Sequence, residues 1–412
     1  LILVNRYFWP DQSATSRLAT DLALALSDLG WQIHAVTSRQ LYDDATADLP
    51  RMERLENIVI HRIWTTRFGR ARLAARAIDY ASFYSGAFGG LLRLARRGDV
   101  IIAMTDPPLL SVSTLPTAAI RGAVQINWLQ DLFPEVAISL GVIRAGIVSG
   151  LLVRLRNWSL RHAVRNVAIG ERMAARLSSQ RMPAGRVNVI HNWADGMAIS
   201  PLDPAENTLR AEWNLAERFV VGYSGNLGRA HDFATILAAA ERLRDVEHIR
   251  FLIIGAGHQL EFVRAEVLRR DLPNVILKPF QPACRLREAL TAPDLHLVSL
   301  LPDLEGLIVP SKFYGVAAAG RPSLFLGSRS GEISELIRAG ACGAVVAIGN
   351  VEELVEQIEG LARSPARRAT LARNARVLFT QRFDRPIALA KWSTVIAEVA
   401  AAMPQPRSSG GW

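Results

Sequence analysis

Short continuous apolar runs alternate with longer segments of helical periodicity along the first half of the chain. Residues 1–4 form an unbroken apolar run, as in a strand buried on both faces of a parallel sheet. Residues 14–29 carry apolar side chains at helical spacing and stop at Gly30, and residues 33–37 are the next expected strand. The opening therefore predicts a strand, a helix and a strand, the first half of a doubly wound sheet. Further strands are expected at 57–63, 100–104, 124–129 and 187–190, and helices at 67–97 and 143–162.

The same pattern restarts after a polar, proline-containing segment at 196–217, which has no clear period. Strands are expected at 219–223, 250–254, 275–277, 295–300, 323–326 and 344–346, and helices at 233–243, 351–362 and 377–400. We therefore predict an α/β chain with two doubly wound, Rossmann-like domains that face each other across a cleft. The expected boundaries are an N-terminal domain at 1–195, a linker at 196–217, a C-terminal domain at 218–378, a helical tail at 379–403 that crosses back to the first domain, and a disordered tail at 404–412.

The composition fits a globular protein with an anionic partner. Half of the 412 residues are hydrophobic, and the formal net charge of +10 comes mainly from arginine. Nucleic acid, a membrane surface and phosphorylated substrates are all anionic, so the charge alone does not choose among them. The aromatic residues are not interleaved with the basic runs as in a base-stacking surface, so we expect no nucleic-acid partner.

The two cysteines, Cys284 and Cys342, supply neither a disulfide framework nor metal-ligand spacing. We expect two buried thiols in a reducing compartment, no metal site and a cytoplasmic location. The sequence begins at Leu1 without a methionine, so a very short leader remains open. The apolar stretches 81–94 and 138–155 are broken by glycine and arginine, and we do not expect either to span a bilayer.

Polar residues follow two predicted strands of the first domain. Asp106 comes soon after the strand at 100–104, and Gln130 and Asp131 follow the strand at 124–129. Ligands bind at the carboxyl ends of strands in open sheets, so these residues are candidates for a binding site. Alternatively, the two aspartates cap the helices that follow them. The loop at 5–13 has no glycine-rich fingerprint, which argues against a tightly held dinucleotide there.

The stretch at 304–322 predicts a loop that leads into a helix. Pro310 and Ser311 stand where the helix starts, Lys312 falls in its first turn, and Gly320 ends it. A helix start presents unpaired backbone N–H groups, and a lysine beside them suits a phosphate. An ordinary capped surface helix with a solvated lysine is the alternative.

The predicted helix at 143–162 has arginines among its apolar residues. Such a helix can lie on an anionic membrane surface. It can equally pack against its own domain with its arginine side chains extended to water. The sequence leaves both interpretations open.

Six short motifs occur in a familiar order along the chain. They are Phe8-Trp9-Pro10 with Ala14-Thr15, Thr105-Asp106-Pro107-Pro108, Gln130-Asp131-Leu132-Phe133-Pro134-Glu135, Asn192-Trp193-Ala194-Asp195, Gly225-Asn226-Leu227-Gly228, and Pro310-Ser311-Lys312 through Gly320-Arg321-Pro322. In this order the chain resembles glycosyltransferase family 4, with the GT-B fold, and within it the branch of bacterial N-acetyl-fucosamine transferases and related colanic acid, capsule and O-antigen (lipopolysaccharide) enzymes. The resemblance implies a retaining, metal-independent transferase without a cofactor. Such an enzyme moves a sugar from a nucleotide-diphosphate donor, here expected to be UDP-linked, to a lipid-linked or saccharide acceptor.

The resemblance also implies roles for individual residues. The expected catalytic residues are Asp131, Lys312 and Arg229. The expected donor-binding residues are Gly225, Asn226, Gly228, His231, Glu305, Pro310, Ser311 and Gly315, and the expected acceptor-binding residues are Ser13, Ala14, Asp106, Gln130 and Glu135. The expected partners are the donor, a polyprenyl-diphosphate-linked sugar or oligosaccharide, and the anionic inner face of a membrane, on which the protein would be peripheral.

This sequence departs from the family pattern at several of these positions. Gly315 replaces a glutamate that holds the donor ribose in relatives, and Glu305 is only a loose substitute for it. Asn226 and His231 stand where relatives often carry an arginine and a lysine, and Gln130 stands where many have a histidine. The positive charge on the donor diphosphate is therefore expected from Arg229 and Lys312.

Two mechanisms and two other functions stay open at this point. We favour front-face attack, in which the acceptor hydroxyl loses its proton to the departing phosphate, and Asp131 as a general base is the alternative. A nucleotide-sugar 2-epimerase resembles the same fold, but this chain has few histidines near the predicted loops. A basic nucleic-acid-binding protein is the less favoured alternative.

Overall fold

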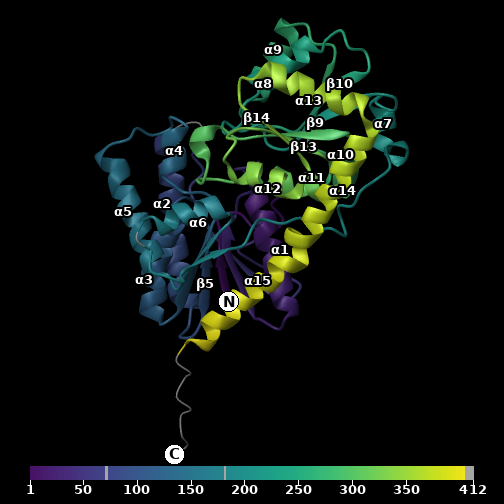
Figure 1. Ribbon diagram of the computed structural model, residues 1–412. Coiled ribbons are helices and arrows are strands. Elements are labelled where there is room, and N and C mark those ends of the chain that lie inside the picture. Colours follow the sequence, from purple (N-terminus) through teal and green to yellow (C-terminus); the bar gives the residue numbers. More distant parts are fainter. Residues whose placement is uncertain (70–72, 181, 404–412) are drawn as a thin grey trace, which may run out of the picture. The chain divides into compact units, whose positions relative to one another are not determined.

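The computed structural model describes residues 1–69, 73–180 and 182–403. The chain divides into two compact units (Figure 1). The first comprises Leu1–His191 together with the chain from Leu389 onward, and the second comprises Asn192–Ala388. Each unit contains one sheet with helices packed against it, so the predicted fold class, two Rossmann-like α/β units, is confirmed.

The first unit is built on an eight-stranded sheet with the strand order β3-β4-β2-β1-β5-β6-β7-β8. Neighbouring strands are parallel, except that β3 pairs antiparallel with β4 at the edge. The strands are β1 (Ile2–Val4), β2 (Ile33–Ser38), β3 (Met52–Leu55), β4 (Ile58–Ile63), β5 (Val100–Ala103), β6 (Val124–Leu129), β7 (Arg165–Ala168) and β8 (Val187–Val189). The central strands β1 and β5 are buried along their whole length, which explains their unbroken apolar sequence.

Six helices between residues 1 and 191 accompany this sheet in the described part of the chain. They are α1 (Ala14–Asp28), α2 (Leu73–Leu94), α3 (Leu110–Arg121), α4 (Glu135–Ser139), α5 (Ile147–His162) and α6 (Glu171–Ser178). The core packs Ile2, Val36 and Ile101 of the sheet against Phe83 and Leu91 of α2. The helix predicted at 67–97 is described from Leu73 onward. Residues 70–72 of that prediction lie outside the described residues.

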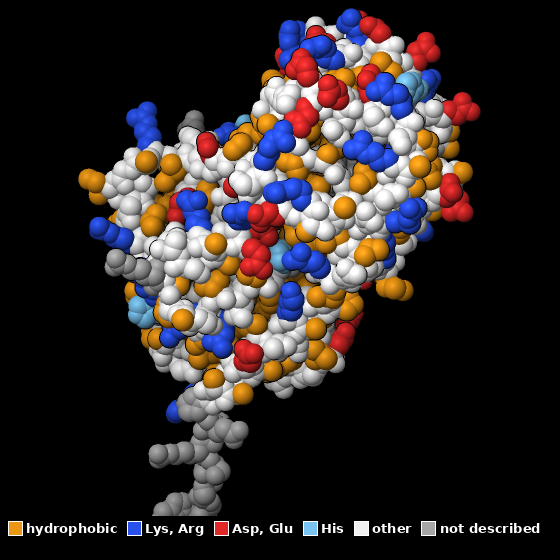
Figure 2. Space-filling view, in the orientation of Figure 1, with side chains coloured by type: hydrophobic (Ala, Val, Ile, Leu, Met, Phe, Trp, Pro, Cys, Tyr) orange, Lys and Arg blue, Asp and Glu red, His pale blue; other side chains and the backbone are white. Residues whose placement is uncertain are grey.

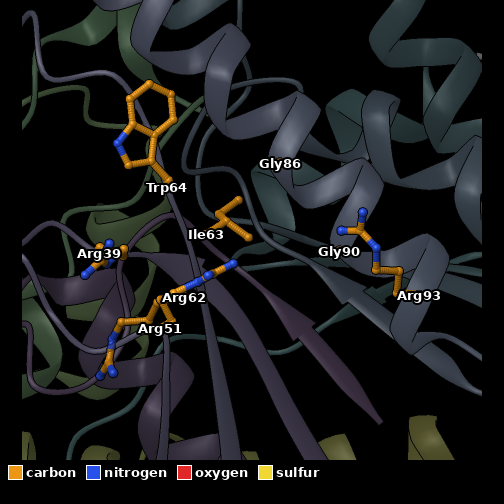
Figure 3. A pocket seen from close by; sticks show the side chains of 8 residues that line it. All are labelled: Arg39, Arg51, Arg62, Ile63, Trp64, Gly86, Gly90 and Arg93. Carbon is orange, nitrogen blue, oxygen red and sulfur yellow. The ribbon is translucent and has the colours of Figure 1, made fainter.

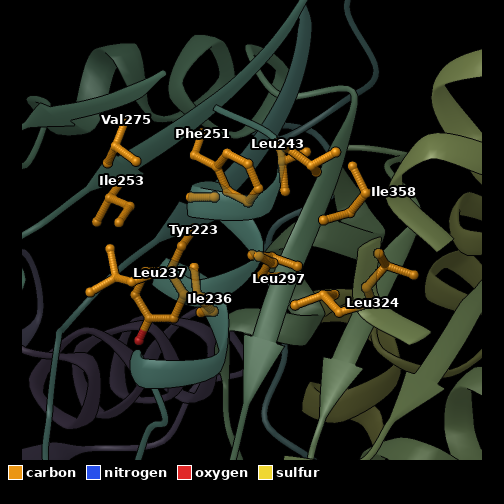
Figure 4. Packing of buried hydrophobic residues seen from close by; sticks show 14 of the residues in the cluster. Tyr223, Ile236, Leu237, Leu243, Phe251, Ile253, Val275, Leu297, Leu324 and Ile358 are labelled. Carbon is orange, nitrogen blue, oxygen red and sulfur yellow. The ribbon is translucent and has the colours of Figure 1, made fainter. Parts of the chain in front are cut away.

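The second unit is built on a six-stranded sheet with the order β11-β10-β9-β12-β13-β14, parallel throughout. The strands are β9 (Phe219–Ser224), β10 (Ile249–Ile254), β11 (Val275–Lys278), β12 (Leu295–Ser299), β13 (Ser323–Leu326) and β14 (Gly343–Val346). The α-helices are α7 (Thr208–Glu212), α8 (Ala234–Arg242), α9 (Leu260–Arg269), α10 (Leu286–Thr291), α11 (Lys312–Ala318), α12 (Glu332–Gly340), α13 (Val351–Arg363) and α14 (Pro365–Arg382). Figure 4 shows apolar side chains of the sheet meeting those of α8 and α13 in one core.

The segment 196–217, predicted as a linker, lies within the second unit. It contains a 3₁₀ turn at Pro204–Glu206 and helix α7. Leu209 and Leu215 are fully buried and pack with Val220 and Leu252 of the sheet. These two leucines tie the segment to the core of the second unit.

Helix α15 (Arg385–Ala401) carries the end of the chain back to the first unit, as predicted. Its Trp392 is fully buried, and the centroid of its ring lies 4.8 Å from that of Trp128 in β6. An indole pair of this kind buries a large apolar area at one contact. The tail at 404–412, predicted to be disordered, lies outside the described residues.

The order of strands places a topological switch point in each sheet. In the first unit, β1 and β5 are neighbours, and the chain proceeds in opposite directions across the sheet from them. In the second unit, β9 and β12 have the same relationship. Ligands of open parallel sheets bind beyond the carboxyl ends of such strands. The two switch points therefore mark where to look for a site in each unit.

One expectation about the thiols was wrong. Cys342 is buried, but Cys284 is exposed, because it lies in the short 3₁₀ turn Ala283–Arg285 on the surface.

Among the described residues, no helix is both long enough and apolar enough to cross a membrane. The described part of the chain also holds no group of three or more His, Cys, Asp or Glu side chains placed to bind a metal ion.

Candidate active site

Two glycine-rich segments interlock at the switch point of the second unit. The loop after β9 begins at Gly225, with φ of +134°, and the turn after β10 contains Gly255 and Gly257. A Cβ atom at position 255 would lie 2.0 Å from the carbonyl oxygen of Gly225, so only glycine allows this approach. The amide of Leu227 donates to Ala256 O at 2.8 Å. The loop at 225–228 is thus held by backbone packing and is preorganised.

Lys312 points into this loop from the start of α11. Its Nζ donates to Nε2 of His231 at 2.9 Å and lies 5.2 Å from the centroid of the Tyr223 ring. A Cβ atom added to Gly225 would lie 2.6 Å from Lys312 Cε. The lysine therefore fills the space that the missing side chain of Gly225 leaves open.

His231 is fixed by a second hydrogen bond. Its Nδ1 donates to the carbonyl oxygen of Ser299, at the end of β12, over 2.6 Å. With Nδ1 protonated, Nε2 of the neutral ring is an acceptor, which is what Lys312 requires. Gln259 supports the same loop by donating from Nε2 to the carbonyl oxygens of Gly228 and His231. Neighbouring strands β9 and β12 thus bring residues from both sides of the switch point together.

Burial shifts the pKa of both members of the pair in the same direction. Loss of solvation lowers the pKa of Lys312 to about 7. Burial, and then the charge of Lys312, lowers the pKa of His231 to about 3, so this ring is neutral at physiological pH. An anion placed beside Lys312 would favour its charged form. The site is therefore suited to a phosphate group that supplies the missing negative charge.

The start of α11 offers fewer free backbone N–H groups for a phosphate than the sequence indicated. The helix begins after Ser311 as predicted, but it has only seven residues. The amides of Phe313 and Tyr314 already donate to the carbonyl oxygens of Pro310 and Ser311. The positive charge at this site therefore comes from the Lys312 side chain rather than from free helix-start amides.

The remaining donor-side residues have varied surroundings. Asn226 and Arg229 are exposed on the loop after β9. Glu305 accepts from the amide of Glu332 at 3.2 Å, so its carboxylate lies at the start of α12. Gly315 lies in α11, where an added Cβ atom would lie 3.3 Å from Leu290 Cδ1.

In the first unit, Asp106 and Asp131 follow the neighbouring strands β5 and β6. Oδ1 of Asp131 is buried without a hydrogen-bond partner. Burial, and then the nearby charge of Asp106, raises the pKa of Asp131 to about 7, although a hydrogen bond with Thr105 opposes the shift. Neither aspartate caps a helix, because the capping positions of α3 and α4 are Leu109 and Pro134. The structure thus decides against the capping alternative.

Aromatic and basic residues that the sequence analysis missed surround Asp106. Arg6 is buried after β1, its amide donates to Asp106 O at 2.7 Å, and its guanidinium carbon lies 5.3 Å from the centroid of the Tyr80 ring. Burial, and then the charge of Asp106, raises the pKa of Tyr80 to about 12. Tyr84 donates to the carbonyl oxygen of Pro108. Arg6 could have been found by the rule that singled out Asp106, because it too follows a buried strand.

The other predicted acceptor residues lie close to strand ends or helix starts. Ser13 precedes α1 and donates from its amide to Asp11 Oδ1 at 2.8 Å, and Ala14 is exposed at the first position of the helix. The amide of Gln130 donates to Thr105 Oγ1 at 3.3 Å. Glu135 instead forms a nearly buried ion pair with Arg156 of α5, with an N–O distance of 2.6 Å. Glu135 therefore connects α4 to α5.

Two doubly wound units, each with polar residues at its switch point, define a protein of the GT-B fold. Residues 14–193 match the glycosyl transferase 4-like domain, and residues 205–378 match glycosyl transferases group 1. Both matched families are glycosyltransferase domains, and the two matches together account for residues 14–378 apart from 194–204.

Two curated relatives match part of the chain. The probable glycosyltransferase WbjE of Pseudomonas aeruginosa is 31% identical over 59% of this chain and 61% of its own length. The putative colanic acid biosynthesis glycosyl transferase WcaI of Escherichia coli K12 is 26% identical over 63% of this chain and 65% of its own length. The chain thus matches less than two thirds of the length of either relative.

Solved structures match the fold over nearly the whole chain. Sucrose-phosphate synthase from Thermosynechococcus elongatus has a TM-score of 0.77 at 14% identity, covering 97% of this chain and 99% of that one. HepE of Anabaena, in complex with UDP, has a TM-score of 0.70 at 16% identity over 96% and 99%. WaaG, a glycosyltransferase of lipopolysaccharide biosynthesis, has a TM-score of 0.69 at 13% identity over 98% and 100%. At these identities the similarity concerns the fold.

Proposed function

We propose that this protein is a retaining, metal-independent glycosyltransferase that uses a UDP-linked sugar and a lipid-linked or saccharide acceptor in bacterial surface polysaccharide synthesis. The observation that carries the proposal is Lys312, a partly buried lysine held against His231 and the glycine loop at 225–228. The surroundings of Lys312 disfavour the charged form of its amine, and a bound donor diphosphate would favour that form again.

Transfer of a sugar requires stabilisation of the leaving diphosphate as the glycosidic bond breaks. A fixed cation in a site with little water stabilises this developing charge without reorganisation. Lys312 supplies that cation in our proposal, and the exposed Arg229 on the same loop supplies a second. The backbone at Gly225 and Gly228 positions the diphosphate, together with Asn226, His231, Pro310 and Ser311. Glu305 and Gly315 are the candidates for the ribose side.

For the acceptor we propose the switch point of the first unit. Asp106, Gln130 and the start of α1 at Ser13 and Ala14 would hold the attacking sugar, with Glu135 supporting them through α4. In the front-face mechanism, the acceptor hydroxyl gives its proton to the departing phosphate. The raised pKa of Asp131 also suits a general base near neutral pH, so this carboxyl is the alternative proton acceptor.

Relatives support the class of donor and the pathway. HepE, which shares the fold, forms a complex with UDP-glucose. WcaI is described as a colanic acid biosynthesis enzyme, and WaaG as a lipopolysaccharide enzyme. We transfer these properties to this chain as part of the proposal.

A peripheral location on the inner membrane face is also part of the proposal. Helix α5 exposes Ile147 by 94%, Val148 by 74% and Leu151 by 53%. Arg154 and Arg161 lie on the same helix and are exposed. Apolar side chains beside arginines favour the surface of an anionic bilayer. Nucleic acid is not proposed as a partner, and on the face in Figure 2 basic side chains are scattered with acidic ones between them.

The test of the proposed function is binding followed by product analysis. Purified protein is screened by thermal shift against nucleoside diphosphates and nucleotide sugars, and selective stabilisation by UDP is expected. The donor found is then incubated with a lipid-linked acceptor, and NMR of the product reports the anomeric configuration. Retention supports the proposal. No stabilisation by any nucleotide, or an inverted product, would contradict it.

A further inference from the structure

A cavity lined by four arginines lies in the first unit, beside the edge of the sheet. Its volume is about 460 Å³, and Arg39, Arg51, Arg62 and Arg93 line it (Figure 3). Arg39 follows β2, Arg51 precedes β3, and Arg62 lies in β4. Arg93 comes from α2, on the other side of Ile63. None of the predicted donor or acceptor residues lines this cavity.

Two of the four arginines already have partners. Arg62 is completely buried and pairs with Glu53 at 2.6 Å, and it also donates to the carbonyl oxygen of Trp9. Arg39 pairs with Asp48 at 3.0 Å. These two arginines fix the wall of the cavity, and their charges are compensated.

Arg51 and Arg93 differ from the other two. Both are exposed, and neither has an acidic partner among the described residues. No acidic side chain lines the cavity in the part of the chain that the structure describes. Two uncompensated guanidinium groups on opposite sides of Ile63 favour a ligand with more than one negative charge. Arginine is the residue best suited to bind phosphate oxygens in pairs.

A second hollow of about 430 Å³ continues from the first. It shares Arg51, Arg62, Arg93, Ile63 and Gly90 with the arginine cavity. Its other lining residues are Val36, Met52, His61 and Leu94, and Met52 is 64% exposed. The second hollow thus adds three apolar side chains to the arginines that it shares with the first. Trp64, 63% exposed, adds another apolar surface at the first cavity.

The glycines of α2 keep this space open. A Cβ atom at position 90 would lie 3.8 Å from Ile63 Cγ2, so a larger side chain there would project into the cavity wall. A Cβ atom at the neighbouring Gly89 would meet nothing within 4 Å, and Gly89 does not line the cavity. The helix thus offers both a position that controls the cavity and a matched position that does not.

We propose that these joined cavities bind an amphiphilic diphosphate, with the two phosphate groups at Arg51 and Arg93 and the hydrocarbon chain over Ile63, Met52 and Leu94. The size of each cavity lies in the range of small-molecule sites. The inference deepens the proposed function, on which it rests for the identification of the ligand as the lipid carrier of the acceptor. The phosphate groups could also belong to a soluble metabolite or a glycerophospholipid, and the experiment separates these sources.

The test is calorimetric titration of the full chain with four probes: farnesyl diphosphate, inorganic pyrophosphate, farnesol and dihexanoyl phosphatidic acid. Farnesyl diphosphate should bind saturably and more tightly than the other three. Arg93→Gln should weaken it roughly tenfold, because a hydrogen-bonded charge is lost, and Gly90→Leu should remove binding. Arg96→Gln and Gly89→Leu are the matched controls and should bind as the wild type does.

Several results would overturn this inference. The first is the absence of saturable farnesyl diphosphate binding. The second is wild-type affinity for farnesyl diphosphate in Arg93→Gln and in Gly90→Leu. The third is binding of pyrophosphate or phosphatidic acid as tight as that of farnesyl diphosphate. A UDP titration of every variant reports on the second unit, and a thermal melting curve of every variant confirms folding. Farnesyl diphosphate binding without UDP binding would contradict the proposed transferase function and support the proposed diphosphate site. UDP binding without farnesyl diphosphate binding would support the transferase function and contradict the diphosphate site.

Discussion

Nζ of Lys312 lies 2.9 Å from Nε2 of His231, whose Nδ1 is in turn held by the carbonyl oxygen of Ser299. Nε2 of the imidazole accepts a hydrogen bond from the lysine, because its other nitrogen, Nδ1, is already a hydrogen-bond donor. Burial lowers the pKa of the lysine to about 7 and that of the imidazole to about 3. The pair therefore holds a lysine in place while leaving its charge dependent on the ligand.

Replacing Lys312 by alanine should weaken UDP binding and lower the transfer rate by roughly 10- to 1000-fold, as for other groups that stabilise developing charge. Lys278→Ala is the control, because Nζ of Lys278 lies over a different ring of the same unit, 5.4 Å from the centroid of Trp213. Titration calorimetry measures binding, and initial rates measure transfer. A Lys312→Ala variant with wild-type affinity and rate would remove the lysine from the mechanism.

Binding of UDP at pH 8 should take up a proton. With a pKa of about 7, free Lys312 is mostly neutral at pH 8, and the bound diphosphate raises the pKa of the ammonium group. The affinity of the protein for UDP should consequently fall as the pH rises above 7. Calorimetry in buffers of different ionisation enthalpy measures the proton count. Lys312→Met should abolish this uptake, and uptake unchanged in that variant would assign the proton to another group.

Gly225→Ala should lower both stability and UDP binding. The new Cβ atom would lie 2.6 Å from Lys312 Cε, so the lysine has to move. Gly349→Ala is the matched control, because Gly349 also has positive φ, of +87°, but has open space around its missing side chain. Each substitution should cost about 1–2 kcal/mol of folding free energy through backbone strain. Denaturant unfolding and UDP titration separate the two effects, and equal UDP affinities in the two variants would contradict the placement of Lys312.

Asp131→Asn should make the protein more stable at pH 8. The folded-state pKa of Asp131, about 7, lies above its ordinary value of 3.8, so the folded state binds this proton more tightly. Its contribution to stability is full below pH 3.8 and is lost as the pH rises through 7. The asparagine variant does not ionise, so its advantage over the wild type in unfolding free energy should be larger at pH 8 than at pH 5.

The same variant decides the role of Asp131 in catalysis. If the carboxylate is the general base, Asp131→Asn should lose roughly 100-fold or more of the rate, with donor affinity unchanged. Near-normal turnover of the folded variant would leave front-face attack, with the departing phosphate as proton acceptor. Initial rates with the thermal melting curve as a folding control distinguish these outcomes.

Ile147→Glu should weaken binding to anionic vesicles roughly tenfold, because it removes an apolar side chain that is 94% exposed on α5. Ile120→Glu is the control, since Ile120 is 65% exposed on α3 of the same unit. Flotation with phosphatidylglycerol vesicles at low salt measures the bound fraction. Equal flotation of the two variants would argue against α5 as the membrane contact.

Most of the buried strands were predicted from the sequence, although β7, with three of its four residues buried, was not. Residues 1–4 and 100–104 are continuous apolar runs because both faces of their strands are covered, and the structure confirms both strands. The strand predicted at 124–129 is also confirmed, although it contains the buried polar residues Gln125 and Asn127. Strand β3 was missed because it lies at the antiparallel edge, where the sequence Met-Glu-Arg-Leu alternates between exposed and half-buried positions. The ordered structure of 196–217 was missed for a related reason. Its few apolar anchors, such as Leu209 and Leu215, are too far apart to form a period.

The residues of the candidate site also differ in how far the sequence revealed them. Lys312 and Gly225 were identified from the sequence because a proline-serine start and a glycine loop are local signals. Tyr80 and Gln259 were missed, since their importance comes from neighbours far away in the chain. Arg6 was missed although it follows a buried strand, which is a local signal.

The sequence by itself determined the two doubly wound units and the loops at the ends of their strands, because hydrophobic periodicity and turn residues are properties of consecutive positions. The tertiary structure decided which side chains meet. Strand order brings the loop after β9 beside β12, and this places His231 between Lys312 and Ser299, which are separated by 81 and 68 residues from it. Burial then sets the charge of the lysine, since the cost of removing a charge from water depends on everything packed around it and on no single stretch of the chain.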